Sequence, residues 1–152
     1  MLNKYNKLLD ILKSVDLKKI NNNEINYFKN KKILITGVSG IIGINMLFFF
    51  DALNNKKKTK TTIDGTFNTS IFPFVKKYFK KNKLINFKQI DLSEKILNTK
   101  KKYDFIFHCA GYGQPSKFLK FSNATFKLNS STIMTLEKNL KKNGKFIYMS
   151  ST

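Results

Sequence analysis

The sequence predicts an α/β fold in which a parallel sheet of about five strands lies between two layers of helices. Short apolar runs rich in β-branched residues alternate along the chain with longer helical segments. A cluster of glycines follows the first of these runs directly. Crossovers between parallel strands are right-handed and place helices on both faces of the sheet. The expected fold class is therefore a three-layer, doubly wound parallel sheet.

The elements follow from the positions of the apolar runs and of the residues that interrupt them. Pro73 has to lie in the first turn of its helix, and Asn143-Gly144 is expected to end the last helix. The expected strands cover residues 33–36, 61–67, 85–90, 103–109 and 145–150, and the expected helices cover 41–54, 71–81, 92–97 and a long stretch within 123–140.

Residues 1–30 differ from the α/β pattern and are expected to form a helical extension of the domain at residues 31–152. Leu2, Tyr5, Leu9 and Leu12 recur at helical spacing, and an asparagine-rich turn at 21–23 follows them. We expect a short amphipathic helix that packs on the domain or on a partner.

The 152 residues suffice for one domain with a real core, and the totals favour a soluble, cytoplasmic protein. The single cysteine, Cys109, cannot form an internal disulfide, which favours a reducing compartment. The most apolar stretch, 41–53, contains Asn45 and Asp51 and is too short to span a bilayer. No membrane association is expected, and no signal-peptide pattern is seen.

The net charge of +20 comes from 29 basic residues, all of them lysine. Arginine is the preferred residue for bidentate reading of bases and phosphates, so its absence argues against a specific nucleic-acid partner. A solvated basic surface that attracts anionic ligands is the simpler interpretation. His108 is the only histidine, so we expect no histidine-based metal site and no Ser-His-Asp triad.

Gly37, Gly40 and Gly43 stand at a spacing of three between the first strand and the helix after it. Gly37 can make the tight turn, Gly40 can let a pyrophosphate approach the backbone, and Gly43 can let the helix pack closely. The helix start at Ile41 and Ile42 offers free N–H groups and the positive end of the dipole. Ser39 is expected to contact the phosphates or to cap the helix. These residues predict a dinucleotide-binding loop.

The form Thr-Gly-x-x-Gly-x-x-Gly resembles the extended branch of the short-chain dehydrogenase/reductase family, the NAD-dependent epimerases and dehydratases. The resemblance runs from about residue 31 to 152 and implies a Rossmann-type fold. Four more segments are similar to family landmarks in the same order: Asp91-Leu92, His108-Cys109-Ala110-Gly111, Lys127-Leu128-Asn129 and residues 147–152.

The resemblance implies a role for each landmark. Asp91, with Leu92, would hold the adenine amino group, and Ala110 and Gly111 would pass the nicotinamide ribose. Asn129 would lie behind the active site, and Ser151 would be the catalytic hydroxyl. The residues alone leave simpler roles open, since Asp91 could cap a helix, and Asn129 and Ser151 could be ordinary surface residues.

An acid at the end of the second strand would bind the adenosine ribose and favour NAD. Asp64 is the candidate. If the strand continues past it, Asn68 takes the terminal position, and Lys60 could then suit a 2′-phosphate. The expected cofactor is NAD, with NADP not excluded.

The resemblance implies the NAD(P)-binding portion of a nucleotide-sugar epimerase, dehydratase or decarboxylase that oxidises a sugar hydroxyl transiently. Its partners would be a nucleotide-sugar and, as a possible assembly, a second copy in a homodimer. The family's Tyr-x-x-x-Lys pair would follow residue 152, so we expect an amino-terminal fragment with an incomplete C-terminus that is inactive alone. The alternative is a non-catalytic dinucleotide-binding regulator or sensor.

Overall fold

The computed structural model describes residues 2–149, with side chains from Tyr5 onward. In chain order the elements are α1 (Leu2–Lys13), α2 (Asn22–Tyr27), β1 (Lys32–Thr36), α3 (Ile41–Lys57), β2 (Thr62–Phe67), α4 (Pro73–Phe79), β3 (Ile85–Gln89), β4 (Tyr103–His108), α5 (Pro115–Lys120), α6 (Ser122–Asn129), α7 (Ser131–Glu137) and β5 (Leu140–Tyr148).

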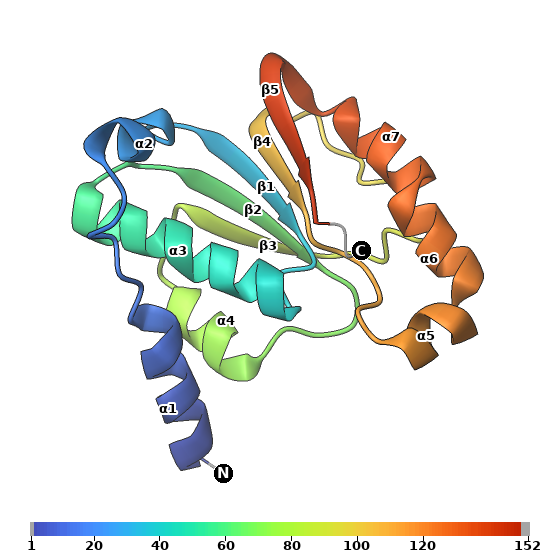
Figure 1. The fold of residues 1–152 in the computed structure, drawn as a ribbon, viewed down its shortest axis with the longest axis horizontal. Helices are drawn as coiled ribbons and strands as arrows, with labels where there is room; N and C mark the ends of the chain where they lie inside the picture. The colour runs from blue at the N-terminus through green and yellow to red at the C-terminus, as the bar shows by residue number, and fades with distance from the viewer. Residues whose placement is uncertain (1, 150–152) are drawn as a thin grey trace.

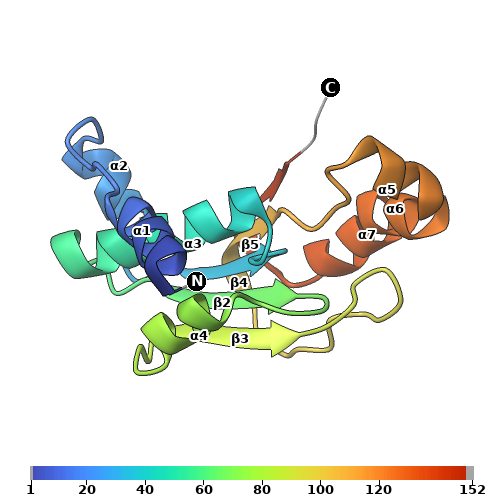
Figure 2. The ribbon, with the colours of Figure 1, turned by 90° about the horizontal axis from the view of Figure 1, so that it is seen from below.

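The strands form one parallel sheet in the order β3-β2-β1-β4-β5, which confirms the predicted fold class. The chain proceeds outward from β1 through β2 to β3 and then crosses back to the other side of β1 with β4. Figure 2 shows the arrows of β2 and β3 pointing toward the end of the molecule where α5, α6 and α7 gather. Connections leave β1 and β4 in opposite directions at this end, which opens a crevice there.

Alternate residues of the central strands pack into two separate hydrophobic cores, one on each face of the sheet. Ile33 and Ile35 of β1 and Phe107 of β4 pack with α1 to α4, whereas Leu34 and Ile106 pack with α6 and α7. Figure 1 accordingly shows α3 and α4 on one side of the sheet and α6 and α7 on the other. Both faces are covered at the central strands β1 and β4, and these two strands carry the buried apolar runs that are usual in parallel sheets.

The amino-terminal segment belongs to the first core. α1 packs against α3 and α4, and Leu12, Leu17 and Ile25 are all buried. The asparagine-rich stretch predicted as a turn instead starts α2. Asn21 caps that helix by accepting from the Glu24 N–H, while the Glu24 carboxylate accepts from the Asn21 N–H.

The predicted helix at 92–97 is wrong, because residues 92–97 form a turn and irregular chain. The Asp91 carboxylate accepts hydrogen bonds from both the N–H and the hydroxyl of Ser93, at 2.9 and 2.6 Å. This local arrangement competes with helix formation. Asp91 is therefore a turn residue and caps no helix.

The long helix predicted within 123–140 is broken into α6 and α7 at Ser130, whose φ of −132° and ψ of −87° are not helical. The chain leaves α7 at Glu137, so Asn143-Gly144 does not end a helix but lies inside β5. A Cβ on Gly144 would stand 2.9 Å from the Tyr103 carbonyl oxygen. Glycine is needed there because the register between β4 and β5 shifts and brings the two backbones close.

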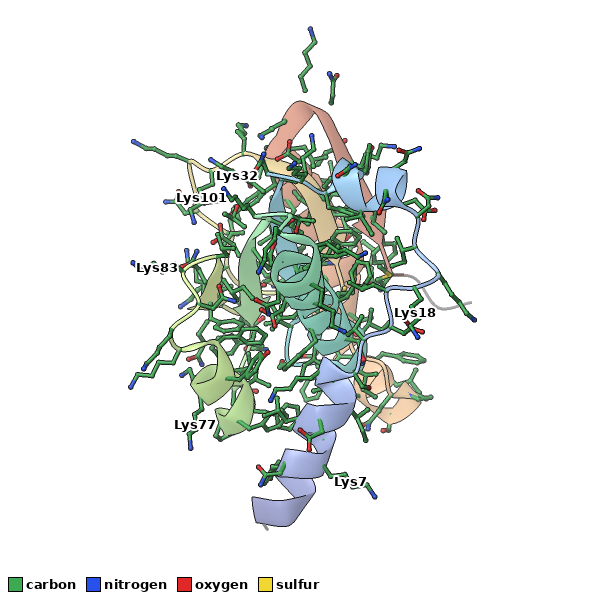
Figure 3. All side chains as sticks on the ribbon, turned by 90° about the vertical axis from the view of Figure 1, so that its left-hand side faces the viewer. Lys7, Lys18, Lys32, Lys77, Lys83 and Lys101 are labelled. Atoms are coloured by element: carbon green, nitrogen blue, oxygen red, sulfur yellow. The ribbon has the colours of Figure 1, made fainter. Side chains whose placement is uncertain are left out.

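The lysines point outward on several sides. Figure 3 labels Lys7 on α1, Lys77 on α4 and Lys101 before β4, and their side chains extend from different parts of the surface. In the part of the chain that the structure describes, no helix is both long and apolar enough to cross a membrane. Nor do residues 2–149 bring three or more histidine, cysteine or acidic side chains together as metal ligands.

The burial of the amino-terminal segment can be tested with two isoleucines. Ile25→Ala should lower the free energy of unfolding by about 2 to 5 kcal/mol, because it leaves a cavity in the core. Ile11 is 60% exposed, so Ile11→Ala should change stability by no more than about 0.5 kcal/mol. Urea denaturation of both variants measures the difference. Equal effects would contradict the packing described above.

Candidate functional site

A cavity of about 220 Å³ lies at the carboxyl ends of the strands, in the crevice between β1 and β4. Its walls come from the end of β2, from the segments that follow β1, β2, β3 and β4, and from one residue of α6. The lining residues are Gly37, Ser39, Gly40, Thr66, Phe67, Asn68, Ile90, Asp91, Leu92, Cys109, Ala110, Gly111, Tyr112 and Leu128.

Gly37 brings the ends of β1 and β4 together. Its φ of 70° is in the left-handed region, and a Cβ there would stand 2.8 Å from the Cα and N atoms of Ala110. Both constraints exclude any other residue. Gly43 is fixed in a similar way, because its Cβ would overlap the Gly37 carbonyl oxygen. The fold itself therefore requires these two glycines.

Gly40 differs from the other two glycines. Its φ of −81° suits any residue, and a Cβ would meet only the Gly37 oxygen, at an ordinary 3.4 Å. No contact within the protein therefore requires glycine at this position. Because Gly40 lines the cavity, the absence of a side chain keeps open a space that a ligand can enter.

Gly40 is also the N-cap of α3, and no side chain caps this helix. Ser39 lines the cavity but does not cap α3, which corrects one of the two roles expected for it. The first N–H groups of α3, at Ile41 and Ile42, have no partner within the helix, and both side chains are exposed. A helix start of this kind, next to a cavity, favours a bound anion.

A buried chain of hydrogen bonds fixes the far wall of the cavity. The Thr36 hydroxyl accepts from the Ala110 N–H at 3.2 Å and lies 2.8 Å from His108 Nδ1. His108 Nε2 lies 2.9 Å from the Leu128 carbonyl oxygen, which can only accept. Nε2 therefore carries the proton, and Nδ1 accepts from the Thr36 hydroxyl. The chain ties β1, β4 and α6 to one another.

Burial lowers the pKa of His108, although the hydrogen bond to Leu128 acts in the opposite direction. The imidazole is thus neutral near pH 7, as the proton position just derived requires. His108 is fully buried, lies behind the cavity wall and has a structural role here.

Asp91 and Asn68 form the wall at the ends of β2 and β3. Asn68 Nδ2 donates to Asp91 Oδ2 at 3.1 Å, and Asp91 Oδ1 accepts from the Ser93 hydroxyl. Burial acts to raise the pKa of Asp91, but the hydrogen bonds from Ser93 and Asn68 outweigh it and hold this pKa below its ordinary value. Asp91 therefore presents a charged acceptor at the cavity.

The structure does not bring Asp64 to the cavity. β2 continues past this residue to Phe67, so Asn68 takes the terminal position. The Asp64 carboxylate instead accepts from Lys101 Nζ at 2.8 Å and from the Tyr103 hydroxyl at 2.9 Å. Lys60 precedes β2 and lies at the opposite end of the strand, away from the cavity.

The remaining predicted residues divide as follows. Leu92, Ala110 and Gly111 line the cavity, whereas Asn129 is exposed at the end of α6 and its neighbour Leu128 lines the cavity instead. Ser151 lies outside the described residues. Five further residues line the cavity and were not predicted to do so, because their only signal is a position at or just after the end of a strand: Thr66, Phe67, Ile90, Cys109 and Tyr112.

Comparison with known proteins identifies relatives of this arrangement. The sequence model of the NAD-dependent epimerase/dehydratase family matches residues 33–152. No curated protein matches the chain.

Among solved structures, Mth375, an epimerase from Methanothermobacter thermautotrophicus, superposes with a TM-score of 0.63 at 18% identity over 85% of this chain and 38% of that one. Pen from Bacillus thuringiensis gives 0.60 at 20% identity over 82% and 39%. WbmF from Bordetella bronchiseptica, solved with NADH, gives 0.60 at 18% identity over 81% and 36%. The chain thus spans 36% to 39% of these three proteins, and at these identities the likeness concerns the fold.

The hydroxyl of Thr36 can be tested by two substitutions. Thr36→Val keeps the shape but leaves the Ala110 N–H without a partner, which should cost about 1 to 3 kcal/mol of unfolding free energy. Thr36→Ser retains the hydroxyl and should be the more stable variant. Chemical denaturation compares the two, and a valine variant as stable as the serine variant would contradict the network.

His108 predicts a dependence of stability on pH. The unfolded chain takes up a proton on this side chain more readily than the folded one, because folding lowers its pKa. Stability should therefore be full above about pH 6.5 and should fall, by at most about 1.4 kcal/mol per pH unit, as the pH drops toward the folded pKa.

Urea denaturation between about pH 7.5 and 5.5 measures this slope. His108→Gln is the control, since it removes the only histidine. Its stability should change less over the same range, and an unchanged slope would assign the effect to other groups.

Proposed function

Because the chain belongs to the NAD-dependent epimerase/dehydratase family, we propose that its cavity binds NAD and that it forms the cofactor-binding portion of a nucleotide-sugar epimerase, dehydratase or decarboxylase. The observation that carries the proposal is Gly40. No contact within the protein requires glycine at position 40, which lies where the start of α3 meets the cavity. A bound pyrophosphate would require the space that the missing side chain leaves.

The lining residues fit the parts of a dinucleotide. Gly37 and Gly40, with the N–H groups of Ile41 and Ile42, would hold the pyrophosphate, and Ser39 would add a hydroxyl. On one side of this loop, Asp91 and Leu92 would bind the adenine, because Asp91 offers a charged acceptor to the amino group. On the other side, Ala110 and Gly111 would lie along the nicotinamide ribose.

Bound NAD would supply a reversible hydride acceptor, which allows a sugar hydroxyl to be oxidised transiently to a ketone. The chain's own contribution is to bind and orient. The hydrogen bonds that the Thr36 hydroxyl donates to His108 and accepts from the Ala110 N–H hold the wall beside the proposed nicotinamide position. Ser151 is proposed as the hydroxyl that contacts the reacting oxygen of the sugar.

Two observations support a nucleotide-sugar as substrate. WbmF, which shares the fold, has also been solved with NAD+ and UDP. The net charge of +20 attracts anions, and a diphosphate-linked sugar is an anion.

We also propose a reducing, cytoplasmic location. Cys109 is free, and its burial raises the pKa of the thiol to about 11, so it is an unreactive thiol in the cavity wall.

A non-catalytic dinucleotide-binding regulator is the second candidate. The observation that favours it is the tyrosine in the cavity, Tyr112, which is followed four residues later by Ser116. Tyr112 therefore has no lysine at the spacing that lowers a tyrosine pKa for proton transfer, so it suits binding and not proton transfer. Turnover of nucleotide-sugars by the complete protein would exclude the regulator.

Substitution of Gly40 tests the proposal. Gly40→Asp should fold normally, since a Cβ at this position meets only the Gly37 oxygen, at an ordinary 3.4 Å. It should weaken NAD binding at least about tenfold by placing a carboxylate against the pyrophosphate. Calorimetry at millimolar NAD and a thermal melt measure binding and folding separately.

Gly113→Asp is the matched control. Gly113 has open space at its Cβ and does not line the cavity, so this variant should bind NAD like the unaltered chain. A folded, unaltered chain that binds no NAD would refute the proposal, as would equal binding by the Gly40 and Gly113 variants.

A further inference from the structure

We propose that this cavity accepts the 2′-phosphorylated dinucleotide NADP about as well as NAD, with Asn68 at the adenosine ribose and Lys88 and Lys95 near the added phosphate. The inference rests on the proposed function and concerns the selectivity of the same site. Three features of the described residues support it.

The first feature is the residue at the end of β2. An acid in this position holds the ribose hydroxyls and repels a 2′-phosphate, which gives preference to NAD. Here the position is occupied by Asn68, whose side chain is neutral. Asp64 lies four residues earlier, about 13 Å along an extended strand. Its carboxylate is held there by Lys101 and Tyr103.

The second feature is the state of Asp91, the one acid among the residues that line the cavity. Both of its carboxylate oxygens already accept hydrogen bonds, Oδ1 from Ser93 and Oδ2 from the Asn68 amide. Asn68 therefore lies against Asp91 Oδ2, so a neutral amide and not a second carboxylate stands beside this oxygen. The repulsion that an acid at position 68 would exert is missing.

The third feature is a second hollow that shares Asn68 and Asp91 with the cavity. Its other walls include Lys88 and Lys95. Lys95 is exposed, and Lys88 Nζ donates only weakly, to the Asn98 carbonyl oxygen at 3.4 Å. A further hollow, which shares Ser39 with the cavity, adds the hydroxyl-bearing residues Thr69 and Ser70. Cations and hydroxyl donors suit a phosphate monoester.

The first measurement is calorimetric titration of the unaltered chain with NAD and with NADP at the same ionic strength. We expect dissociation constants within about tenfold of each other, that is, within about 1.4 kcal/mol. NAD binding with a larger preference over NADP would overturn this inference and leave the proposed function intact. Binding of neither cofactor would overturn both.

Charge reversal then locates the phosphate. Lys95→Glu should weaken NADP binding at least about fivefold and leave NAD binding unchanged, because only NADP carries the extra dianion. Lys60→Glu makes the same change in net charge at the opposite end of β2 and should affect neither cofactor selectively. Equal effects of the two variants on NADP would show a general charge effect and overturn the assignment.

Asn68→Asp restores the acid at the end of β2. We expect it to lower the affinity for NADP at least about tenfold relative to NAD. A folded Asn68→Asp variant with unchanged selectivity would overturn the role of Asn68. The new carboxylate would lie beside Asp91, so a thermal melt accompanies the titration to show that the variant folds. If it does not fold, the comparison of Lys95→Glu with Lys60→Glu decides the question.

Discussion

The Thr36 hydroxyl links β1 to β4, the two neighbouring strands from which the strand order proceeds in opposite directions. By accepting from the Ala110 N–H and donating to His108, it fixes the ends of β1 and β4 side by side. Gly37 can then approach Ala110 closely, and His108 extends the link to α6 through the Leu128 carbonyl. This link shapes the crevice, because the cavity walls that follow β1 and β4 are both attached to it.

The three glycines of the loop separate what the fold needs from what a ligand needs. Gly37 and Gly43 are dictated by close contacts of the backbone with itself. Gly40 is not, and it is the one that faces the open space at the start of α3. The sequence shows three equivalent glycines. The structure shows that Gly37 and Gly43 are required for packing, whereas Gly40 leaves an opening for a ligand.

Local signals predicted most of the fold, whereas the position of Asp64 depends on residues far apart in the sequence. The strands, the glycine turn and the start of α3 depend on neighbours a few residues away. Asp64 does not end β2, because Gly65 is a strand residue on which Val38 packs and the strand continues to Phe67. The partners that hold Asp64, Lys101 and Tyr103, follow it by 37 and 39 residues. No local pattern could have predicted these two partners.

The sheet order also has a consequence for association between copies. In the described part of the chain, β3 and β5 are the outer strands, and an unpaired strand edge is a template for addition of another strand. Lys88 on β3 and Lys142 and Lys145 on β5 place positive charge along both edges. Two such edges repel each other, so these lysines oppose edge-to-edge association of two sheets. Chemical modification that neutralises these amines would remove that repulsion.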